Sequence, residues 1–342
     1  MSRKKFIKEF LSNFNASPKI IDVGARTGLE DNLLFLSQNI DTKILGFEPE
    51  PLEFERLSMN LHNNLTLLNT ALYSSKKEIT LYVTKDPGLC SIYKPKFDFL
   101  KEIETKKALG NYIVVKEIKV EANTLDNEVT STEFKNADFI KIDTEGSEVD
   151  ILKGSEKLLS QSLIGVESEM SYIQLREEQP TFQDLIKLLH DHDFHIFDAR
   201  NKFQKRESGQ GYGKRKGQLI YCDALFFKSL KGIDNITIEL SQKDKKTKIC
   251  NSIAIITSYG YFDYAYEIFN YFKDIFNEDE CVAMEKSFKY SEITVMKLPH
   301  FPGRGLIGLI FYKIGMIFSS GHYNNRSANR FGDNNLGNID WW

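Results

Sequence analysis

The sequence contains few cysteines, and none of them stands in a metal-binding or redox motif. The four residues are Cys90, Cys222, Cys250 and Cys281, and no two of them form a CxxC pair. The spacing therefore indicates neither a zinc site nor a disulfide framework. Cysteines without such a framework favour the reducing cytoplasm as the compartment of this protein.

The chain also lacks a strong charge bias, an export signal and a long apolar run. Its net charge of -3 over 342 residues gives no general attraction to nucleic acid, so we expect no such partner. Residues 6–14 are amphipathic and lack the apolar core and cleavage site of a signal peptide. The most apolar window, residues 305–318, is shorter than the ~20 residues of a transmembrane helix and contains Lys313. We expect no transmembrane segment there and at most weak contact with a membrane surface.

Short β-branched runs alternate with helical segments from residue 19 to about residue 228, which predicts an α/β fold with a parallel sheet. The expected strands cover residues 19–23, 43–47, 65–69, 138–142, 163–167, 194–198 and 219–227. The expected helices cover residues 29–37, 51–61, 148–159 and 181–190. We expect the last two strands to pair as an antiparallel hairpin, and Ser147 with Asp150 to cap the third helix. Further strands at 78–84 and 114–120 predict an insertion near the ligand-binding edge.

The first chemical motif is a buried strand that runs into a glycine-containing turn at Gly24 and Gly28, with Asp22 near the strand end. A dinucleotide site would require G-x-G-x-x-G, because the pyrophosphate lies over a helix N-terminus. The observed G-x-x-x-G spacing with an acid favours a ligand with an ammonium group. A glycine turn without any ligand is the alternative interpretation of this motif alone.

Acidic residues follow at the ends of two later strands, a single one at the first and a cluster at the second. Glu48 ends the second strand, where a carboxylate can bind a ribose diol in both NAD-dependent enzymes and methyltransferases. Asp143, Glu145 and Glu148 follow the fourth strand, at the carboxyl edge where open α/β sheets bind ligands. The cluster has the oxygen ligands that suit Mg²⁺, but no histidine or asparagine is paired with it, so we predict no metal.

These motifs together resemble the FkbM family of S-adenosylmethionine-dependent O-methyltransferases, over roughly residues 19–227. The matching residues are Asp22-Val23-Gly24-Ala25, Gly28, Phe47-Glu48-Pro49, Asn69, Ala71-Leu72, Thr124-Leu125-Asp126, Lys141-Ile142-Asp143, Glu145-Gly146, Glu148, Leu152-Lys153-Gly154 and Glu167. The resemblance implies a Rossmann-like class I methyltransferase sheet of seven strands, with S-adenosylmethionine as the cofactor.

The resemblance also implies the residues of the cofactor site. They are Asp22, Gly24, Arg26, Gly28, Glu48, Asn69, Ala71 and Asp143. Those at the glycine turn would lie near the methionine moiety, Glu48 on the ribose, and Asn69 and Ala71 near the adenine. Arg26 stands where the family usually has asparagine. It would strengthen a contact with the cofactor carboxylate if it faces inward, and would be solvated if it faces outward.

Methyl transfer to an alcohol needs placement of the acceptor oxygen and removal of a proton. The candidate catalytic residues are Asp143, Glu145 and Glu167, and Glu169 could orient the substrate. A basic loop before the last strand contains Lys202, Arg206 and Arg215. We expect these three to bind substrate, with a phosphate group as one possible target, although a solvated loop is the alternative.

After Lys228 the chain becomes polar and then aromatic, which predicts two domains. Residues 1–230 would form the methyltransferase domain, and residues 231–342 a smaller, mainly helical, aromatic-rich extension. Its apolar helical segments, at 259–276 and 306–319, would expose a large apolar surface to water unless they pack against another surface. We expect packing on the first domain, then self-association as a homo-oligomer, then membrane contact, in that order.

The function that we predict is O-methylation of a hydroxyl on a sugar, glycan or natural-product scaffold. The word hydroxyl comes from the family resemblance, because the residues themselves indicate only an adenosine site beside an acidic cleft. Two alternatives stay open. An NAD-dependent oxidoreductase is disfavoured by the missing third glycine, and a non-catalytic cofactor-binding or interaction module would bind the cofactor without transferring its methyl group.

Overall fold

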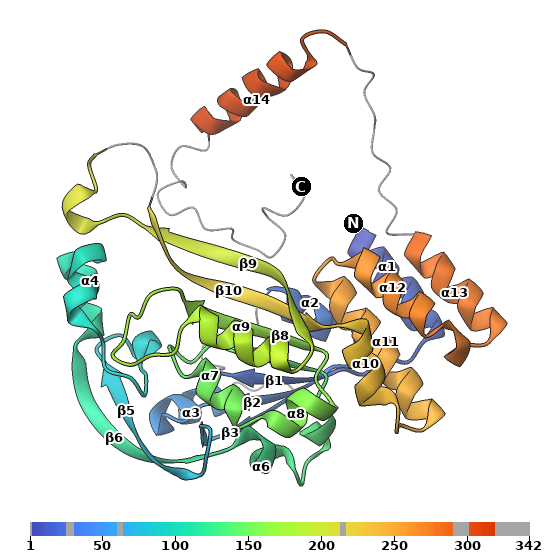
Figure 1. Ribbon diagram of the computed structural model, residues 1–342, viewed down its shortest axis with the longest axis horizontal. Helices are drawn as coiled ribbons and strands as arrows, with labels where there is room; N and C mark the ends of the chain where they lie inside the picture. Colours follow the sequence, from blue (N-terminus) through green and yellow to red (C-terminus); the bar gives the residue numbers. More distant parts are fainter. Residues whose placement is uncertain (1, 25–30, 60–63, 213–216, 290–300, 319–342) are drawn as a thin grey trace.

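The computed structural model describes residues 2–24, 31–59, 64–212, 217–289 and 301–318. A seven-stranded sheet crosses the molecule and carries helices on both faces (Figure 1). From one edge to the other its strands are β3 (Leu65–Leu68), β2 (Lys43–Phe47), β1 (Lys19–Val23), β7 (Phe139–Ile142), β8 (Gly165–Ser171), β10 (Gln218–Lys228) and β9 (Phe194–Gln204). The first five are parallel, and β10 runs antiparallel to both of its neighbours. The structure confirms the predicted Rossmann-like α/β fold, its seven strands and their terminal hairpin.

Two layers of helices cover the sheet, and each layer shares a hydrophobic cluster with it. One layer contains α1 (Ser2–Asn13), α2 (Asp31–Asn39), α10 (Leu230–Thr237), α11 (Gln242–Ser258), α12 (Phe262–Tyr271) and α13 (Glu278–Lys289). The other contains α6 (Leu125–Val129), α7 (Glu148–Lys153), α8 (Glu156–Gln161) and α9 (Phe182–Asp191). Successive strand residues point to opposite faces, so Ile20 packs in the first cluster and Ile21 in the second.

The helices that follow the last strand pack directly on the sheet. Residues 248–258 of α11 are all buried, and the Tyr259 ring stacks on Phe139 of β7 with 5.4 Å between centroids. At the amino end of β7, Lys248 Nζ lies 2.5 Å from the Asp138 carboxylate. Residues from α10 to α13 therefore share one core with the N-terminal part of the chain, although we predicted a domain boundary at residue 230.

Two predicted helices are interrupted by glycines. The helix predicted at 148–159 is divided into α7 and α8 at Gly154, where an added Cβ would lie 2.3 Å from the Tyr73 carbonyl oxygen. The segment 259–276 is not one helix, because Gly260 adopts a φ of 95° between α11 and α12. A residue in this left-handed region ends a helix, and glycine tolerates it best.

The capping pair predicted for α7 is wrong. Ser147 makes no side-chain bond to the helix, and its hydroxyl donates instead to Thr144 Oγ1 at 2.8 Å. Asp150 Oδ2 accepts a hydrogen bond from the Tyr93 hydroxyl at 2.6 Å. Both side chains thus bind residues outside the helix, Thr144 and Tyr93, and the turn before α7 does not form the side-chain hydrogen bonds of a helix cap.

A second, three-stranded sheet stands beside the carboxyl end of the main sheet (Figure 1). Its strands are β4 (Ala71–Leu72), β6 (Val114–Asn123) and β5 (Lys77–Thr84). The chain between β5 and β6 forms α4 (Phe97–Ile103), α5 (Lys106–Leu109) and 3-10 turns at Pro87–Leu89 and Gly110–Tyr112. This sheet confirms the two strands that were predicted for the insertion.

The remaining helices contribute less to the core. α3 (Pro51–Ser58) follows β2 and contains no fully buried residue. α14 (Arg304–Phe318) stands apart from both helix layers (Figure 1). Within the described ranges, no helix combines the length and the apolar character that crossing a membrane requires.

Candidate active site

A pocket of about 220 Å³ opens at the carboxyl end of the parallel strands. Parallel strands bring their last residues and the loops that follow to one edge of the sheet, where folds of this kind bind ligands. Residues at the ends of β1, β2, β7 and β8 line one side of the pocket. The small sheet and the segment 87–92 line the other side. The insertion therefore completes the pocket that the main sheet begins.

The tips of β1 and β7 meet at the pocket through a close backbone approach. Gly24 has a φ of 86°, and an added Cβ would lie 1.9 Å from the Asp143 carbonyl oxygen. The Asp143 amide donates to the Val23 carbonyl at 3.0 Å, which holds the two tips together. Gly24 and Asp143 both line the pocket. Arg26 and Gly28, which we also predicted to bind the cofactor, lie outside the described residues.

The end of β2 places Glu48 in the pocket wall. The residue is only 5% exposed, and its Oε1 accepts a hydrogen bond from the Glu50 amide at 2.9 Å. Asn69 Nδ2 donates to the Glu48 carbonyl at 2.8 Å. Asn69 does not line the pocket, whereas Ala71 does. Asn69 therefore supports the turn that presents Glu48, and Ala71 forms part of the pocket wall itself.

Asp22 lies beneath the pocket, where a buried lysine joins it to Asp143. Lys141 Nζ lies 3.7 Å from Asp22 Oδ1 and 3.4 Å from Asp143 Oδ2. Both Asp22 and Lys141 are almost fully buried. An ammonium group between two carboxylates offsets the repulsion that burial would otherwise strengthen. Asp22 does not line the pocket, and it acts on Asp143 through Lys141.

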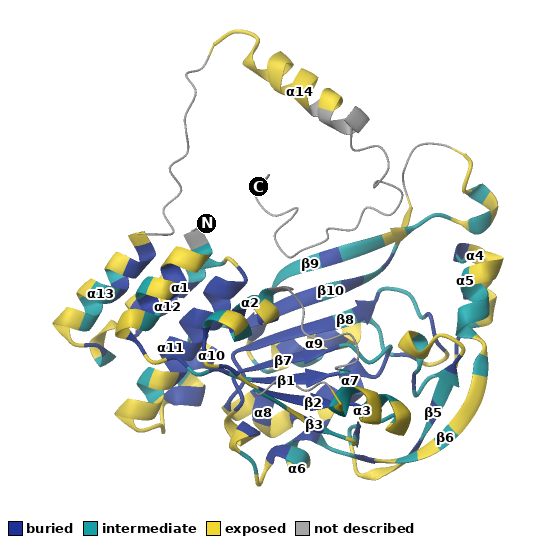
Figure 2. Ribbon diagram, turned by 180° about the vertical axis from the view of Figure 1, so that it is seen from behind, coloured by how far each residue is buried: buried dark blue, intermediate teal, exposed yellow. Residues whose placement is uncertain are grey.

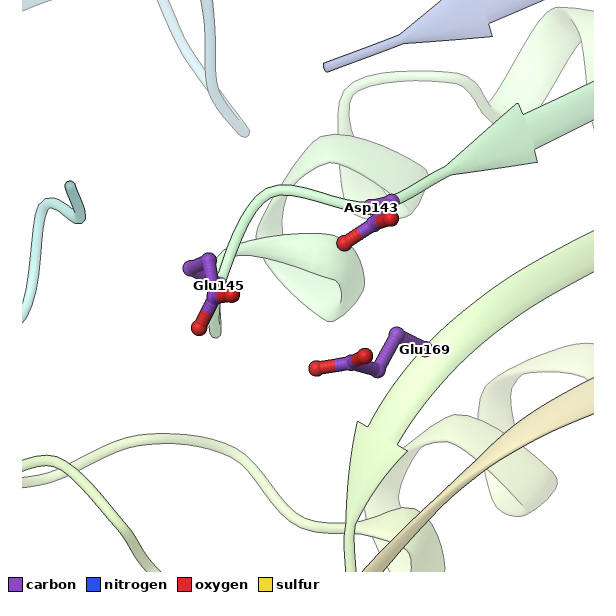
Figure 3. A group of neighbouring side chains, drawn as sticks. All are labelled: Asp143, Glu145 and Glu169. Atoms are coloured by element: carbon purple, nitrogen blue, oxygen red, sulfur yellow. The ribbon is translucent and has the colours of Figure 1, made fainter. Parts of the chain in front are cut away.

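Three carboxylates from the ends of β7 and β8 meet at the pocket wall. Figure 3 shows Asp143, Glu145 and Glu169 facing a common space. One oxygen of each lies within 4.8 Å of the others, and all three residues line the pocket. Mg²⁺ prefers oxygen ligands of this kind, although the sequence predicts no metal here. Like charges at this separation repel strongly when all are ionised.

Two of these carboxyl groups titrate far from their ordinary range. The pKa of Glu145 is raised to about 7, first by burial and then by the charges of Asp143 and Glu148, while the Arg176 guanidinium opposes the rise. Burial also raises the pKa of Glu169 well above its ordinary value, helped by the charges of Asp143 and Glu145. Glu145 therefore titrates near neutral pH, and the raised pKa of Glu169 favours its protonated form.

Glu145 occupies a tight turn with a left-handed backbone. Its φ is 60°, a conformation that costs a residue other than glycine ~1–3 kcal/mol and clusters at functional sites. Glu148 Oε1 accepts from the amides of Thr144 and Gly146, at 2.9 and 3.0 Å, and closes the turn. Ser91 Oγ donates to the Glu145 carbonyl at 2.8 Å. Glu148 and Ser91 thus hold Glu145 at the pocket wall.

A buried arginine connects Glu145 with the opposite wall of the pocket. Arg176 is 1% exposed, and its Nη2 donates to Glu145 Oε2 at 2.6 Å and to the Leu89 carbonyl at 3.2 Å. Leu89 belongs to the pocket-lining segment 87–92. Arg176 therefore fixes the side chain of Glu145 relative to the insertion.

Glu167, the third candidate catalytic residue, contacts residues outside this cluster. Its Oε2 accepts from the Tyr259 hydroxyl at 2.6 Å, and its Oε1 lies 3.5 Å from Arg200. Tyr259 directly follows α11, and Glu167 does not line the pocket. The structure therefore brings Asp143, Glu145 and Glu169 together and places Glu167 between the sheet and a helix layer.

The predicted basic residues lie along the terminal hairpin. Lys202 is in β9, and Arg206 follows that strand. Arg206 forms an ion pair with Glu102 and donates to Gln218 at 2.6 Å. Neither residue lines the pocket, and Arg215 lies outside the described residues.

Sequence reasoning missed Lys141 and Arg176 as members of the site. Lys141 precedes Asp143 by two positions, so the alternation of strand side chains could have placed both on one face. Arg176 lies in a segment without a motif, and its role follows only from the fold.

Comparison with known proteins gives a family match over about half of the chain. Residues 22–196 match the family model described as the methyltransferase FkbM domain. "Methyltransferase sdnD" of Sordaria araneosa is 28% identical over 166 residues, which are 43% of this chain and 64% of that protein. The match thus spans somewhat less than two thirds of that relative's length.

Solved structures with a similar fold include methyltransferases. A putative S-adenosylmethionine-dependent methyltransferase from Listeria monocytogenes is 8% identical, with a TM-score of 0.34 and coverage of 66% of this chain and 98% of that one. The N-terminal domain of EvdMO1 with SAH bound is 11% identical, with a TM-score of 0.31 and coverage of 66% and 81%. At these values the likeness is loose, and the fold rests on the strand order described above.

Proposed function

The chain belongs to the FkbM family of methyltransferases, and on that premise we propose that it methylates a hydroxyl oxygen of a sugar, glycan or natural-product scaffold. S-adenosylmethionine is the methyl donor. The observation that carries the proposal is the position of Glu145, a pocket-lining carboxylate whose pKa is raised to about 7. A carboxylate with this pKa is suited to accept the proton of an alcohol near neutral pH.

The pocket has the features that S-adenosylmethionine requires. Gly24 lets the β1 tip approach the Asp143 backbone at the pocket wall, and Glu48 offers a carboxylate to the ribose hydroxyls. The apolar side chains of Leu72, Ile79 and Leu81 line the far wall and suit the adenine ring. We expect Asp143 to lie where the amino acid moiety meets the acceptor, because it adjoins Gly24 and lies within 4.8 Å of Glu145 and Glu169.

When bound, S-adenosylmethionine supplies an electrophilic methyl group on a sulfonium. In the transfer the sulfur–carbon bond breaks, the oxygen–carbon bond forms, and the sulfonium becomes a neutral thioether. Glu145 accepts the hydroxyl proton of the acceptor. Arg176 and Ser91 hold Glu145 in place, so that the base loses little orientation in each turnover.

Glu169 and two tyrosines near it can orient the acceptor by hydrogen bonds. Burial raises the pKa of Glu169 well above its ordinary value, and the protonated carboxyl that this favours can donate a hydrogen bond to an acceptor oxygen. Tyr112 and Tyr221 lie within electrostatic range of Glu145 and Glu169, and burial raises the pKa of both phenols. A site that combines hydroxyl donors with carboxylate acceptors matches a polyhydroxylated ligand, because each hydroxyl both donates and accepts.

The negative charges of the pocket limit where a phosphorylated acceptor could place its phosphate group. A phosphate beside Asp143, Glu145 and Glu169 would be repelled. We therefore propose that the reacting end of the acceptor is neutral and that any phosphate extends toward Lys202 on β9. The four free cysteines support a cytoplasmic enzyme, because reduced thiols persist in that compartment.

A tritiated-methyl transfer assay with a panel of glycans, nucleotide sugars and polyhydroxylated scaffolds tests the proposal. We expect label in at least one polyhydroxylated acceptor, and equal rates with and without a chelator, because Glu145 rather than a metal activates the hydroxyl. Cofactor binding without transfer to any acceptor would favour the non-catalytic module instead. The family assignment leaves no reason to retain the NAD-dependent alternative.

A further inference from the structure

α14 presents apolar side chains to solvent between Leu306 and Ile314. Six of them are between 44% and 70% exposed: Leu306, Ile307, Leu309, Ile310, Phe311 and Ile314. Figure 2 shows the described part of this helix as exposed and set apart from the buried core. Contiguous apolar surface above a few hundred Å² usually marks a contact with a protein or a membrane. Within the described residues, these six side chains are therefore available for a further contact.

The geometry of α14 suits a surface rather than a span. At ~1.5 Å per residue its 15 residues extend about 22 Å, which is shorter than the ~30 Å hydrocarbon core of a bilayer. In helical projection Arg304, Gly305 and Gly308 share one side. The six exposed apolar residues occupy the rest, and Lys313 lies among them between Leu306 and Leu309. A helix with such a broad apolar face can lie in the plane of an interface with its small and charged side toward water.

The charge of the surrounding sequence identifies the kind of interface. Between Glu292 and Asp333 the sequence contains no acidic residue, although the chain has 48 of them. The same segment contains five basic residues, namely Lys297, Arg304, Lys313, Arg326 and Arg330. An apolar helix inside a purely basic segment complements a surface that is apolar within and anionic at its boundary. An anionic lipid bilayer has both properties.

A second copy of the chain fits this segment less well. Its net charge of -3 gives only a weak attraction to the same cations. The large hydrophobic residues exposed on its described body are also spread over several elements, such as Leu52 on α3, Ile238 after α10 and Val282 on α13. α14 instead concentrates six of them on one helix.

We propose that α14 docks in the plane of an anionic lipid surface, with its apolar side chains among the acyl chains. Arg304 lies at the headgroup level. Lys313 reaches the same level by extending its flexible apolar stem, as lysines at membrane interfaces do. This docking would hold the active site near acceptors at the membrane, and it does not depend on which acceptor is methylated.

Co-sedimentation of the full-length chain with phospholipid vesicles tests the proposal. One set contains phosphatidylcholine alone, and the other contains about one third phosphatidylglycerol. We expect binding to the anionic vesicles, and a roughly tenfold loss of that binding in Phe311→Asp, because the charge would enter the acyl region. Ile238→Asp is the matched control, since Ile238 and Phe311 are both 70% exposed, and it should bind as the wild type does.

Charge reversal and oligomeric mass complete the test. Arg304→Glu should weaken binding to anionic vesicles roughly tenfold and have little effect on phosphatidylcholine vesicles. S-adenosylhomocysteine affinity, measured in parallel, shows that each variant is folded. The proposal is overturned if the wild type does not sediment with anionic vesicles, or if both aspartate variants bind alike. A dimer by light scattering that Phe311→Asp dissociates, without vesicle binding, would identify a second copy as the occupant.

Discussion

The two ends of strand β7 carry acids in opposite environments. At the amino end, Asp138 is buried, and its carboxylate contacts Lys248 Nζ at 2.5 Å and Asn251 Nδ2 at 3.0 Å. At the carboxyl end, Asp143 and Glu145 face Glu169 across a pocket, and the pKa of Glu145 is raised to about 7. One strand thus supplies an acid with complementary partners at one end and an acid crowded by like charges at the other.

The difference separates stability from chemistry. An acid with complementary partners holds elements together, and removing a partner leaves a buried charge without compensation. An acid among like charges has a perturbed pKa, which is common at catalytic sites. We therefore expect substitutions at the amino end of β7 to change the free energy of unfolding, and substitutions at the carboxyl end to change turnover.

The largest change in stability is expected for Lys248→Met. The variant leaves the Asp138 carboxylate buried without its cation, so the free energy of unfolding should fall by about 3–5 kcal/mol in urea denaturation. The control is Lys246→Met, one half-turn away on α11, whose ion pair with Glu280 is partly exposed. It should cost less than about 1 kcal/mol. Equal losses for the two variants would show that Asp138 does not depend on its partner.

The largest change in chemistry is expected for Glu145→Gln. Loss of the base should lower kcat by about 10²–10⁴-fold in the methyl transfer assay, with little change in S-adenosylhomocysteine affinity. Glu177→Gln, an exposed position next to Arg176, is the control and should keep wild-type turnover. Glu145→Gln activity within about tenfold of the wild type would remove this residue from the role of base.

Glu48→Ala should act on binding rather than turnover. Losing a charge-assisted contact with the ribose should weaken S-adenosylhomocysteine about ten- to a hundredfold in calorimetry. Glu55→Ala removes an exposed acid from the neighbouring helix α3 and should leave the affinity unchanged. An unaltered dissociation constant in Glu48→Ala would place the ribose elsewhere.

A smaller and more specific effect is expected for Arg176→Gln. The guanidinium lowers the pKa of Glu145, so its removal should raise that pKa by about one unit or more. The rise in kcat/KM with pH would then move to higher pH. Arg206→Gln removes an arginine that pairs with Glu102 outside the pocket, and it should not move the profile. A merely structural role for Arg176 would lower stability without moving the profile.

The fold and the cofactor edge of the site could be predicted from the sequence, because both depend on local patterns. Short β-branched runs that alternate with helical segments predicted all seven strands. The positions of Gly24, Glu48 and Asp143 at strand ends placed them at one edge of the sheet, since parallel strands end together. The left-handed backbone of Glu145 and its contact with Ser91 gave no signal, because they depend on the insertion folding back over the pocket.

Packing of the C-terminal helices on the first domain was expected, but the contacts that join them to the sheet could not be predicted. The first half of α11 is polar and lysine-rich, which resembles a linker, whereas residues 248–258 are buried. In the sequence Lys248 resembles a surface residue, because lysines are mostly exposed. Only its burial and its contact with Asp138 show that it belongs to the core. Arg176 is a similar case, because a lone arginine in a loop carries no pattern that predicts burial.

The most direct test of the central claim is the pH dependence of kcat/KM in the wild type and in Glu145→Gln. The active form of the base is the carboxylate, which is populated above its pKa, so the rate should rise with pH. The wild-type profile should have its inflection near pH 7, the value to which the pKa of Glu145 is raised. The Glu145→Gln profile should be lower and nearly flat across this range. A variant that keeps the wild-type inflection, or a wild type that titrates only near the ordinary carboxyl pKa of about 4.3, would contradict the assignment of Glu145 as the base.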